Sequence, residues 1–320
     1  MTEKYPYSFL ISSGPVAEED KHSKTLAAGS FNCLWPRAGT VKGLQSFEND
    51  QMLILSHSDV NFRKCVNVSE MVDVTGQVIR ELALNLGWGF IMVINKQDGE
   101  MLLVNDVYGI YPIYYSNTDN NFFISGDGDT VIRKSGCNEF DMEALYEYFL
   151  FNYTLNDRTL IKGINQLTGG CCLRYSKVTG KLSVEKNMTI KSFLSPEKKK
   201  NRTEDDLAGF ISQNISSGLD EEYPVSLPLS GGFDSKLLLA ALLSLGITPD
   251  TFTFGAESST DHQAALLTSG LLGIPHKLLN TESAGDDSFE RKAREFVRRS
   301  PLLPLILDLL AYEDVRNMIN

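Results

Sequence analysis

Strand-like and helix-like segments alternate from residue 225 to residue 279, and few folds accommodate that order. Apolar runs predict strands at 225–229, 251–254 and 276–279, and longer patterns predict helices at 236–245 and 260–272, ended by Gly246 and Gly273. Strands that alternate with helices in this way are typical of a parallel sheet with crossover helices. The later part of the chain is therefore predicted to be an α/β domain.

The residues ahead of this domain indicate where it starts. Residues 195–202 are polar, contain Pro196 and carry four basic residues, as a solvated linker does. Residues 203–206 (Thr-Glu-Asp-Asp) resemble a capping box, and apolar residues at helical spacing follow it. We therefore predict two domains, at 1–194 and 203–320, joined by a linker at 195–202.

The first part of the chain consists of short apolar runs separated by turn residues. These runs predict strands at 8–12, 52–56, 89–95, 101–105, 112–116 and 121–125, and a hairpin formed by 170–176 and 181–184. Residues 141–151 have the spacing of a helix, with Met142, Leu145, Tyr146 and Phe149 on one face. Because strands outnumber helices, this part is predicted to be a mixed or mostly β domain.

Composition and charge exclude several classes of function. The 320 residues are 42% hydrophobic and carry a net charge of -11, whereas binding to nucleic acid or to an anionic membrane needs a basic surface. No apolar run reaches the roughly 20 residues that span a bilayer, and residues 1–6 lack the order of a signal peptide. The five cysteines and four histidines have no metal-site spacing. We therefore expect a cytoplasmic protein with no nucleic-acid partner, no membrane contact and reduced cysteines.

The segment Ser230-Gly231-Gly232-Phe233-Asp234-Ser235 lies between the first strand and the first crossover helix of the α/β domain. Two glycines allow a tight turn and a close approach to a ligand. The helix N-terminus supplies N–H groups, and Ser230 and Ser235 supply hydroxyl donors, so the turn has the composition of an anion cradle. Ligands of open α/β sheets bind at this edge, beyond the carboxyl ends of the strands.

The charge of the chain indicates which anion such a cradle could hold. A helix end stabilises a nearby anion by at most about 2 kcal/mol, which is too little for a polyphosphate in a chain of net charge -11. A metal ion would supply the difference, and Asp234 is the natural oxygen ligand for Mg²⁺. Lys236 either assists or is simply a solvated helix residue. The spacing is not that of a Walker A loop.

This loop resembles the pyrophosphate-binding loop of the N-type ATP pyrophosphatases, which cleave ATP to AMP and pyrophosphate. The resemblance implies that Ser230, Gly231, Gly232 and Ser235 hold pyrophosphate and that Asp234 holds Mg²⁺ and acts in catalysis. Residues 251–255 resemble the strand that borders adenine in that superfamily, which makes Phe254 and Gly255 nucleotide contacts. Asp261, with alanines at 264 and 265, is similar to an Asp-x-x-x-Ala pattern of asparagine synthetases.

The first part of the chain narrows the resemblance to one family. Residues 105–115 (Asn-Asp-Val-Tyr-Gly-Ile-Tyr-Pro-Ile-Tyr-Tyr) resemble the Arg-Asp-x-x-Gly-x-x-Pro-Leu-Tyr-Tyr segment of class II glutamine amidotransferase domains. Residues 86–92, 123–127 and 167–170 are similar to three further segments of that domain. An amidotransferase-like domain followed by a pyrophosphatase loop is the architecture of asparagine synthetases. The resemblance implies an α+β Ntn-hydrolase-like sandwich followed by a parallel-sheet domain, with ATP and Mg²⁺ as cofactors.

The sequence differs from that family in two places, and each difference changes the function that we expect. A glutaminase of this class needs Cys at position 2, where this chain has Thr2, so we predict a first domain without glutaminase activity. In this respect the chain resembles the β-lactam synthetases and lasso-peptide macrolactam synthetases. The sequence ends at Asn320, after a helix-like segment at 311–320 and before the family's second metal-binding loop, so we expect an incomplete synthetase domain.

Together these features predict an ATP-dependent carbon–nitrogen ligase that adenylates a small-molecule or peptide carboxylate for attack by an amine. Two alternatives stay open: a glutamine-hydrolysing asparagine synthetase, and a truncated, non-catalytic relative that binds a nucleotide or a partner. A homodimer and a complementing C-terminal chain are both compatible with the sequence.

Overall fold

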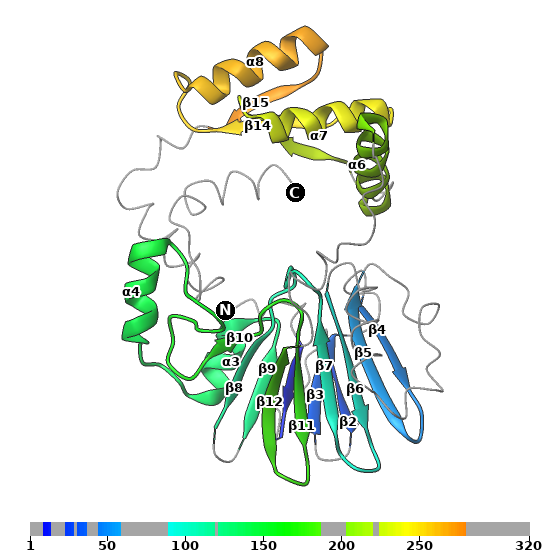
Figure 1. Ribbon diagram of the computed structural model, residues 1–320, viewed down its shortest axis with the longest axis vertical. Coiled ribbons are helices and arrows are strands. Elements are labelled where there is room, and N and C mark those ends of the chain that lie inside the picture. Colours follow the sequence, from blue (N-terminus) through cyan, green and yellow to red (C-terminus); the bar gives the residue numbers. More distant parts are fainter. Residues whose placement is uncertain are drawn as a thin grey trace. The chain divides into compact units, whose positions relative to one another are not determined.

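The structure of the chain is a computed structural model, shown as a ribbon in Figure 1. It describes residues 9–13, 23–28, 31–36, 44–58, 89–118, 121–186, 203–219 and 224–279. These residues fall into two compact units, one before and one after residue 195, and each is considered by itself. Thr2, the predicted linker 195–202 and the predicted helix 311–320 lie outside the described residues.

The first unit contains two antiparallel sheets, each of six strands. One sheet has the order β10 (Asn165–Gln166), β8 (Tyr114–Asn117), β9 (Phe122–Ser125), β1 (Leu10–Ser12), β3 (Phe31–Pro36) and β2 (Ser23–Ala28). The other has the order β12 (Lys181–Lys186), β11 (Cys171–Ser176), β7 (Met101–Asn105), β6 (Gly89–Asn95), β5 (Met52–Ser58) and β4 (Leu44–Glu48). All the strands predicted in this part, and the hairpin β11–β12, are confirmed within a few residues.

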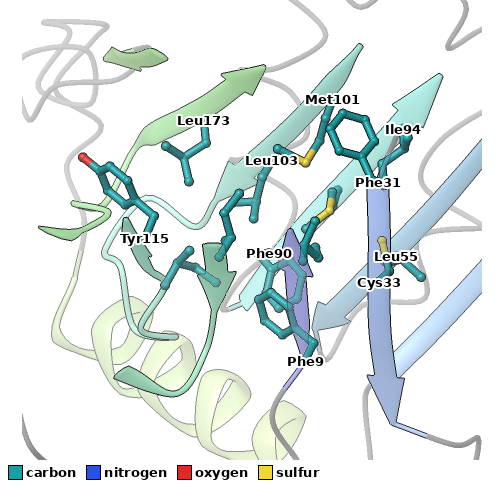
Figure 2. Packing of buried hydrophobic residues seen from close by; sticks show 14 of the residues in the cluster. Phe9, Phe31, Cys33, Leu55, Phe90, Ile94, Met101, Leu103, Tyr115 and Leu173 are labelled. Carbon is teal, nitrogen blue, oxygen red and sulfur yellow. The ribbon is translucent and has the colours of Figure 1, made fainter. Parts of the chain in front are cut away.

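One hydrophobic core joins the two sheets, as Figure 2 shows. Phe31 and Cys33 of β3 belong to the same buried cluster as Leu55 of β5 and Phe90 of β6. The ring of Phe9, just before β1, lies 4.7 Å from the ring of Phe90, centroid to centroid. Because strand side chains alternate between faces, these contacts make the first unit a sandwich of two β-layers.

The structure brings together two sequence segments that are about 60 residues apart. The Asn105 side chain donates to the Leu167 carbonyl at 3.2 Å, and the Gly170 N–H donates to the Asp106 carbonyl at 2.9 Å. Gly169 lies directly against the turn at 107–109. Residues 105–109, which follow β7, and residues 167–170, which precede β11, therefore pack against each other at one edge of the sheet. Both segments are similar to amidotransferase motifs.

Replacing Gly169 with alanine is expected to destabilise the first unit by about 3 kcal/mol. A Cβ at this position would lie 2.5 Å from the Val107 carbonyl oxygen and 2.7 Å from the Gly109 nitrogen, so backbone would have to move. Gly209, inside a helix of the second unit and with open space at its Cβ position, controls for the glycine-to-alanine change itself, because alanine there should stabilise that unit by roughly 0.5–1 kcal/mol. Urea unfolding would measure both, and an unchanged midpoint for Gly169→Ala would contradict the close packing.

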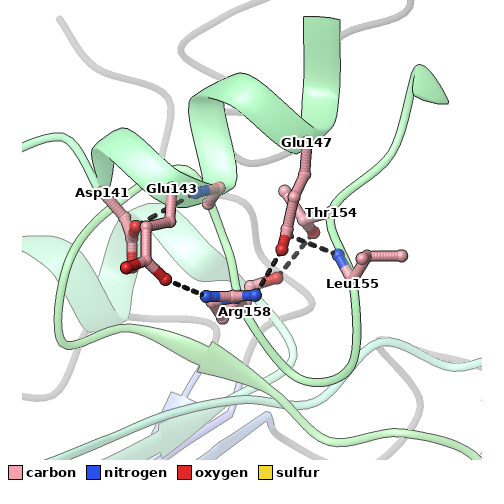
Figure 3. A network of polar contacts seen from close by, with 7 residues as sticks. Asp141, Glu143, Glu147, Thr154, Leu155 and Arg158 are labelled. Atoms are coloured by element: carbon pink, nitrogen blue, oxygen red, sulfur yellow. Dashed lines mark hydrogen bonds and ion pairs between the residues drawn. The ribbon is translucent and has the colours of Figure 1, made fainter. Parts of the chain in front are cut away.

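In the described part of the first unit, two helices accompany the sandwich, α3 (Gly128–Ser135) and the predicted α4 (Met142–Phe151). Asp141 caps α4 by accepting from the Ala144 N–H at 3.0 Å. Arg158 forms ion pairs with Glu143, at 2.6 Å, and with Glu147, which ties the following loop to the helix (Figure 3). On the predicted apolar face, Met142, Tyr146 and Phe149 are exposed, so the helical spacing was predicted correctly but does not correspond to a buried face.

The second unit follows the predicted alternation. Its elements are α6 (Glu204–Gly218), β13 (Ser226–Pro228), α7 (Phe233–Ser244), β14 (Asp250–Phe254), α8 (Thr260–Leu272) and β15 (His276–Leu279). The three strands pair parallel in the order β13–β14–β15. The predicted capping box is confirmed, since Thr203 and Asp206 cap α6 reciprocally. Helix α7 begins at Phe233, three residues before the predicted start, because Gly232 already serves as its N-cap.

Candidate functional site

The segment Ser230–Ser235 connects the end of β13 to the first turn of α7. Ser230 and Ser235 stabilise this loop through hydrogen bonds between its own residues. The Ser230 N–H donates to the Ser235 Oγ at 3.1 Å, and the two hydroxyl oxygens are 3.1 Å apart. The Gly232 N–H donates to the Ser230 Oγ at 3.2 Å. The predicted serine donors thus lie together, and in this structure they bond to each other and to the loop backbone.

A residue from the next helix completes the loop. Asp261, in the first turn of α8, accepts from the Gly231 N–H at 2.9 Å. A Cβ at Gly231 would lie 3.1 Å from the Asp261 carboxylate and 3.4 Å from the Ala264 Cβ, so the two helix starts lie close together here. Lys236 donates to the Gly231 carbonyl at 3.0 Å. The Asp-x-x-x-Ala pattern drew attention to Asp261 in the sequence, but it did not predict this contact with the loop.

The start of α7 has the features of an anion site. Among the described residues, no side chain caps this helix, so the N–H groups of its first turn have no side-chain acceptor there. Gly231 and Gly232 are exposed, and the backbone of the turn is open to a ligand. A helix end of this kind attracts phosphate through its N–H groups and its dipole.

Asp234 lies in the first turn of α7 with an exposed side chain. Among the described residues, no hydrogen bond or ion pair is formed by its carboxylate, and no group of three or more His, Cys, Asp or Glu side chains could hold a metal ion. A single carboxylate beside a phosphate site suits Mg²⁺, which is commonly bound by one or two carboxylates, substrate phosphates and water. The residues present therefore fit a magnesium–phosphate ligand, with Asp234 as the protein's contribution.

Phe254 and Gly255 lie at the same edge of the sheet as this loop, because parallel strands end on one side. Phe254 pairs with Leu279 of β15, and the Gly255 N–H donates to the Leu279 carbonyl at 3.1 Å. Gly255 has a φ of 118°, which an L side chain rarely adopts. Both residues are partly buried. The arrangement leaves them beside the loop, where a bound nucleotide could reach them.

Comparison with known proteins identifies similarity in the first unit. Residues 76–186 match the glutamine amidotransferase domain family. The glutamine-hydrolyzing asparagine synthetase 1 of Bacillus subtilis (strain 168) is 24% identical over 190 residues, which are 57% of this chain and 29% of that protein. The match thus spans less than a third of that relative's length. It supports the predicted amidotransferase-like domain, and the relative is an enzyme.

Two solved structures resemble the chain only loosely. The glutamine phosphoribosylpyrophosphate amidotransferase of B. subtilis, complexed with ADP and GMP, has a TM-score of 0.25 at 10% identity, covering 81% of this chain and 54% of that one. A structure described as the allosteric regulatory enzyme of purine biosynthesis has a TM-score of 0.27 at 10% identity, covering 85% and 59%. TM-scores in this range do not establish a common fold.

The sequence also predicted reduced cysteines and no membrane-spanning segment. None of the cysteines that the structure describes forms a disulfide. Adjacent Cys171 and Cys172 on β11 are both buried, and Cys171 belongs to the core between the sheets. Within the described ranges, no helix is long and apolar enough to cross a bilayer.

Proposed function

We propose that this chain is an asparagine synthetase-like, ATP-dependent amide ligase, with the loop Ser230–Ser235 as its pyrophosphate site. The observation that carries the proposal is the uncapped start of α7 beside a glycine turn at the carboxyl edge of a parallel sheet. The similarity of residues 76–186 to an amidotransferase domain adds support, because that pairing of domains is typical of asparagine synthetases.

In the proposed reaction, a substrate carboxylate oxygen attacks the α-phosphorus of ATP. The bond from that phosphorus to the bridging oxygen breaks, and pyrophosphate leaves with the electron pair. An amine nitrogen then attacks the acyl carbon, loses a proton, and displaces AMP to form the amide. Charge develops on the pyrophosphate in the first step, so the N–H groups of the first turn of α7 and the Ser230 and Ser235 hydroxyls would stabilise that transition state.

Asp261 makes a cation necessary in this scheme. Its carboxylate already accepts the Gly231 N–H at 2.9 Å, so a phosphate would enter next to a negative charge. Two unit charges about 4 Å apart repel by roughly 1–4 kcal/mol at a protein surface. Mg²⁺ held by Asp234 would screen that repulsion while the helix end contributes its dipole.

The family match favours a second candidate, glutamine hydrolysis by the first unit. Release of glutamate from glutamine would test it directly, whatever the state of the nucleotide site.

The non-catalytic alternative is tested by pyrophosphate exchange into ATP in the presence of carboxylates. Binding of ATP with no exchange for any carboxylate would favour that alternative over the ligase.

Calorimetric titration with ATP tests the proposed site itself. We expect binding in Mg²⁺ and at least about tenfold weaker binding in EDTA, since the metal offsets the acidic surroundings. Gly231→Val should weaken MgATP binding by about tenfold, because its side chain would fill the turn against Asp261 and Ala264. Gly270→Ala, in α8 with no atom within 4 Å of its Cβ position, is the matched control and should bind normally. A parental chain that binds no MgATP would refute the proposal.

A further inference from the structure

His276, the first residue of β15, contacts two threonines of the neighbouring strand β14. Its Nδ1 lies 2.9 Å from the Thr251 Oγ1, and its Nε2 lies 3.3 Å from the Thr253 Oγ1. Both threonines are buried, with exposed fractions of 1% and 5%. The ring therefore spans two hydroxyl groups that point to the same side of β14.

Each of these two hydroxyls already donates its proton to a backbone carbonyl oxygen. Thr251 donates to the Pro275 carbonyl at 2.6 Å, and Thr253 donates to the Leu229 carbonyl at 2.5 Å. A hydroxyl has one proton, so towards His276 each threonine oxygen can only accept. Towards these two oxygens the imidazole can therefore act only as a donor, through whichever ring nitrogen carries a proton.

The Thr253 bond leads directly to the candidate site. Leu229 is the last residue before Ser230, and its own N–H donates to the Phe252 carbonyl at 2.8 Å. The side chain of Leu229 is buried in the core of the second unit. A shift of the Leu229 carbonyl would therefore move the start of the loop, while the rest of that residue is held by the sheet and the core.

We propose that Thr253 and His276 are positioning residues for the nucleotide loop: His276 orients the Thr253 hydroxyl, which holds the Leu229 carbonyl and so places Ser230. This inference rests on the proposed function, because it concerns the same loop. Neither residue touches the loop's own side chains in the contacts described above, so both act through the backbone.

The surroundings of His276 favour the neutral form of its imidazole ring over the protonated form. Burial, and the neighbouring His262 of α8, lower the pKa of His276 below its usual value. The two imidazole rings are stacked with their centroids 5.6 Å apart. Among the described residues, His262 is the titratable group that faces this ring. A neutral ring carries one N–H, so orienting Thr253 requires the tautomer that has this proton on Nε2.

The test compares MgATP affinity across paired variants of the full chain. Thr253→Val keeps the shape and removes the hydroxyl, and we expect about fivefold weaker binding, whereas Thr253→Ser should bind within about twofold of the parent. His276→Leu should also bind about fivefold more weakly. His276→Gln should restore binding, since the Gln amide nitrogen is as many bonds from Cβ as the histidine Nε2 and can donate to Thr253.

Thermal unfolding of each variant separates positioning from simple loss of structure. Recovery by His276→Gln and Thr253→Ser, at unfolding midpoints similar to those of the weak binders, would support the inference. A folded His276→Leu or Thr253→Val chain that binds MgATP like the parent would overturn it and leave the proposed function standing. A parental chain that binds no MgATP would overturn both.

Discussion

Replacing Asp106 with alanine should destabilise the first unit by about 4–5 kcal/mol, the largest effect on stability that we expect from a single polar residue here. The Asp106 side chain is fully buried at the end of β7. Its carboxylate accepts from four backbone N–H groups, those of Gly89, Tyr108, Ile110 and Tyr111, at 2.9–3.3 Å. Alanine would leave these donors without their acceptor, in a loop that also anchors Gly170.

Two control variants are expected to lose less stability than Asp106→Ala. Asp106→Asn keeps one acceptor oxygen and should cost roughly half as much. Asp141→Ala removes a helix cap that satisfies one N–H group, and should cost about 1 kcal/mol. Both tryptophans of the chain precede residue 195, so tryptophan fluorescence in urea reports on the first unit. An Asp106→Ala midpoint within about 1 kcal/mol of the parent would mean that water or backbone rearrangement replaces the carboxylate.

Local patterns were enough to predict most elements. The strands β6 and β7 are found at the predicted residues because each is an unbroken apolar run between turns. The strand β3 was missed, although Phe31, Cys33 and Trp35 alternate with less buried residues and are themselves buried. That period of two was the available signal. β2 and β4 are mixed in polarity, so their formation depends on pairing with β3 and β5.

Contacts between distant segments could not be predicted in the same way. The residues of the loop Ser230–Ser235 were identified from their types, but the bond from Gly231 to Asp261 joins positions 30 residues apart. The link from Thr253 to Leu229 likewise depends on the parallel register of β13 and β14. Propensity describes one segment at a time, whereas these bonds follow from which strand ends and helix starts meet at the sheet edge.

Removing the Asp234 carboxylate should have the largest effect on ligand binding. We expect Asp234→Ala to weaken MgATP binding by about 30-fold, or roughly 2 kcal/mol, because the metal would lose its only proposed protein ligand. The exposed side chain argues against a folding defect as the cause of such a loss, since surface substitutions usually change stability by less than about 0.5 kcal/mol. Calorimetry in Mg²⁺ measures the change.

The same variant should behave oppositely without metal. In EDTA the Asp234 charge only repels the phosphates, so Asp234→Ala should bind ATP as well as the parent or up to about threefold more tightly. Asp205→Ala is the matched control, since Asp205 is also an exposed acid in the first turn of a helix, α6. It should leave both titrations unchanged. Equal losses for Asp234→Ala in Mg²⁺ and in EDTA would assign the residue to loop structure, because only a metal ligand makes the sign of the effect depend on the metal.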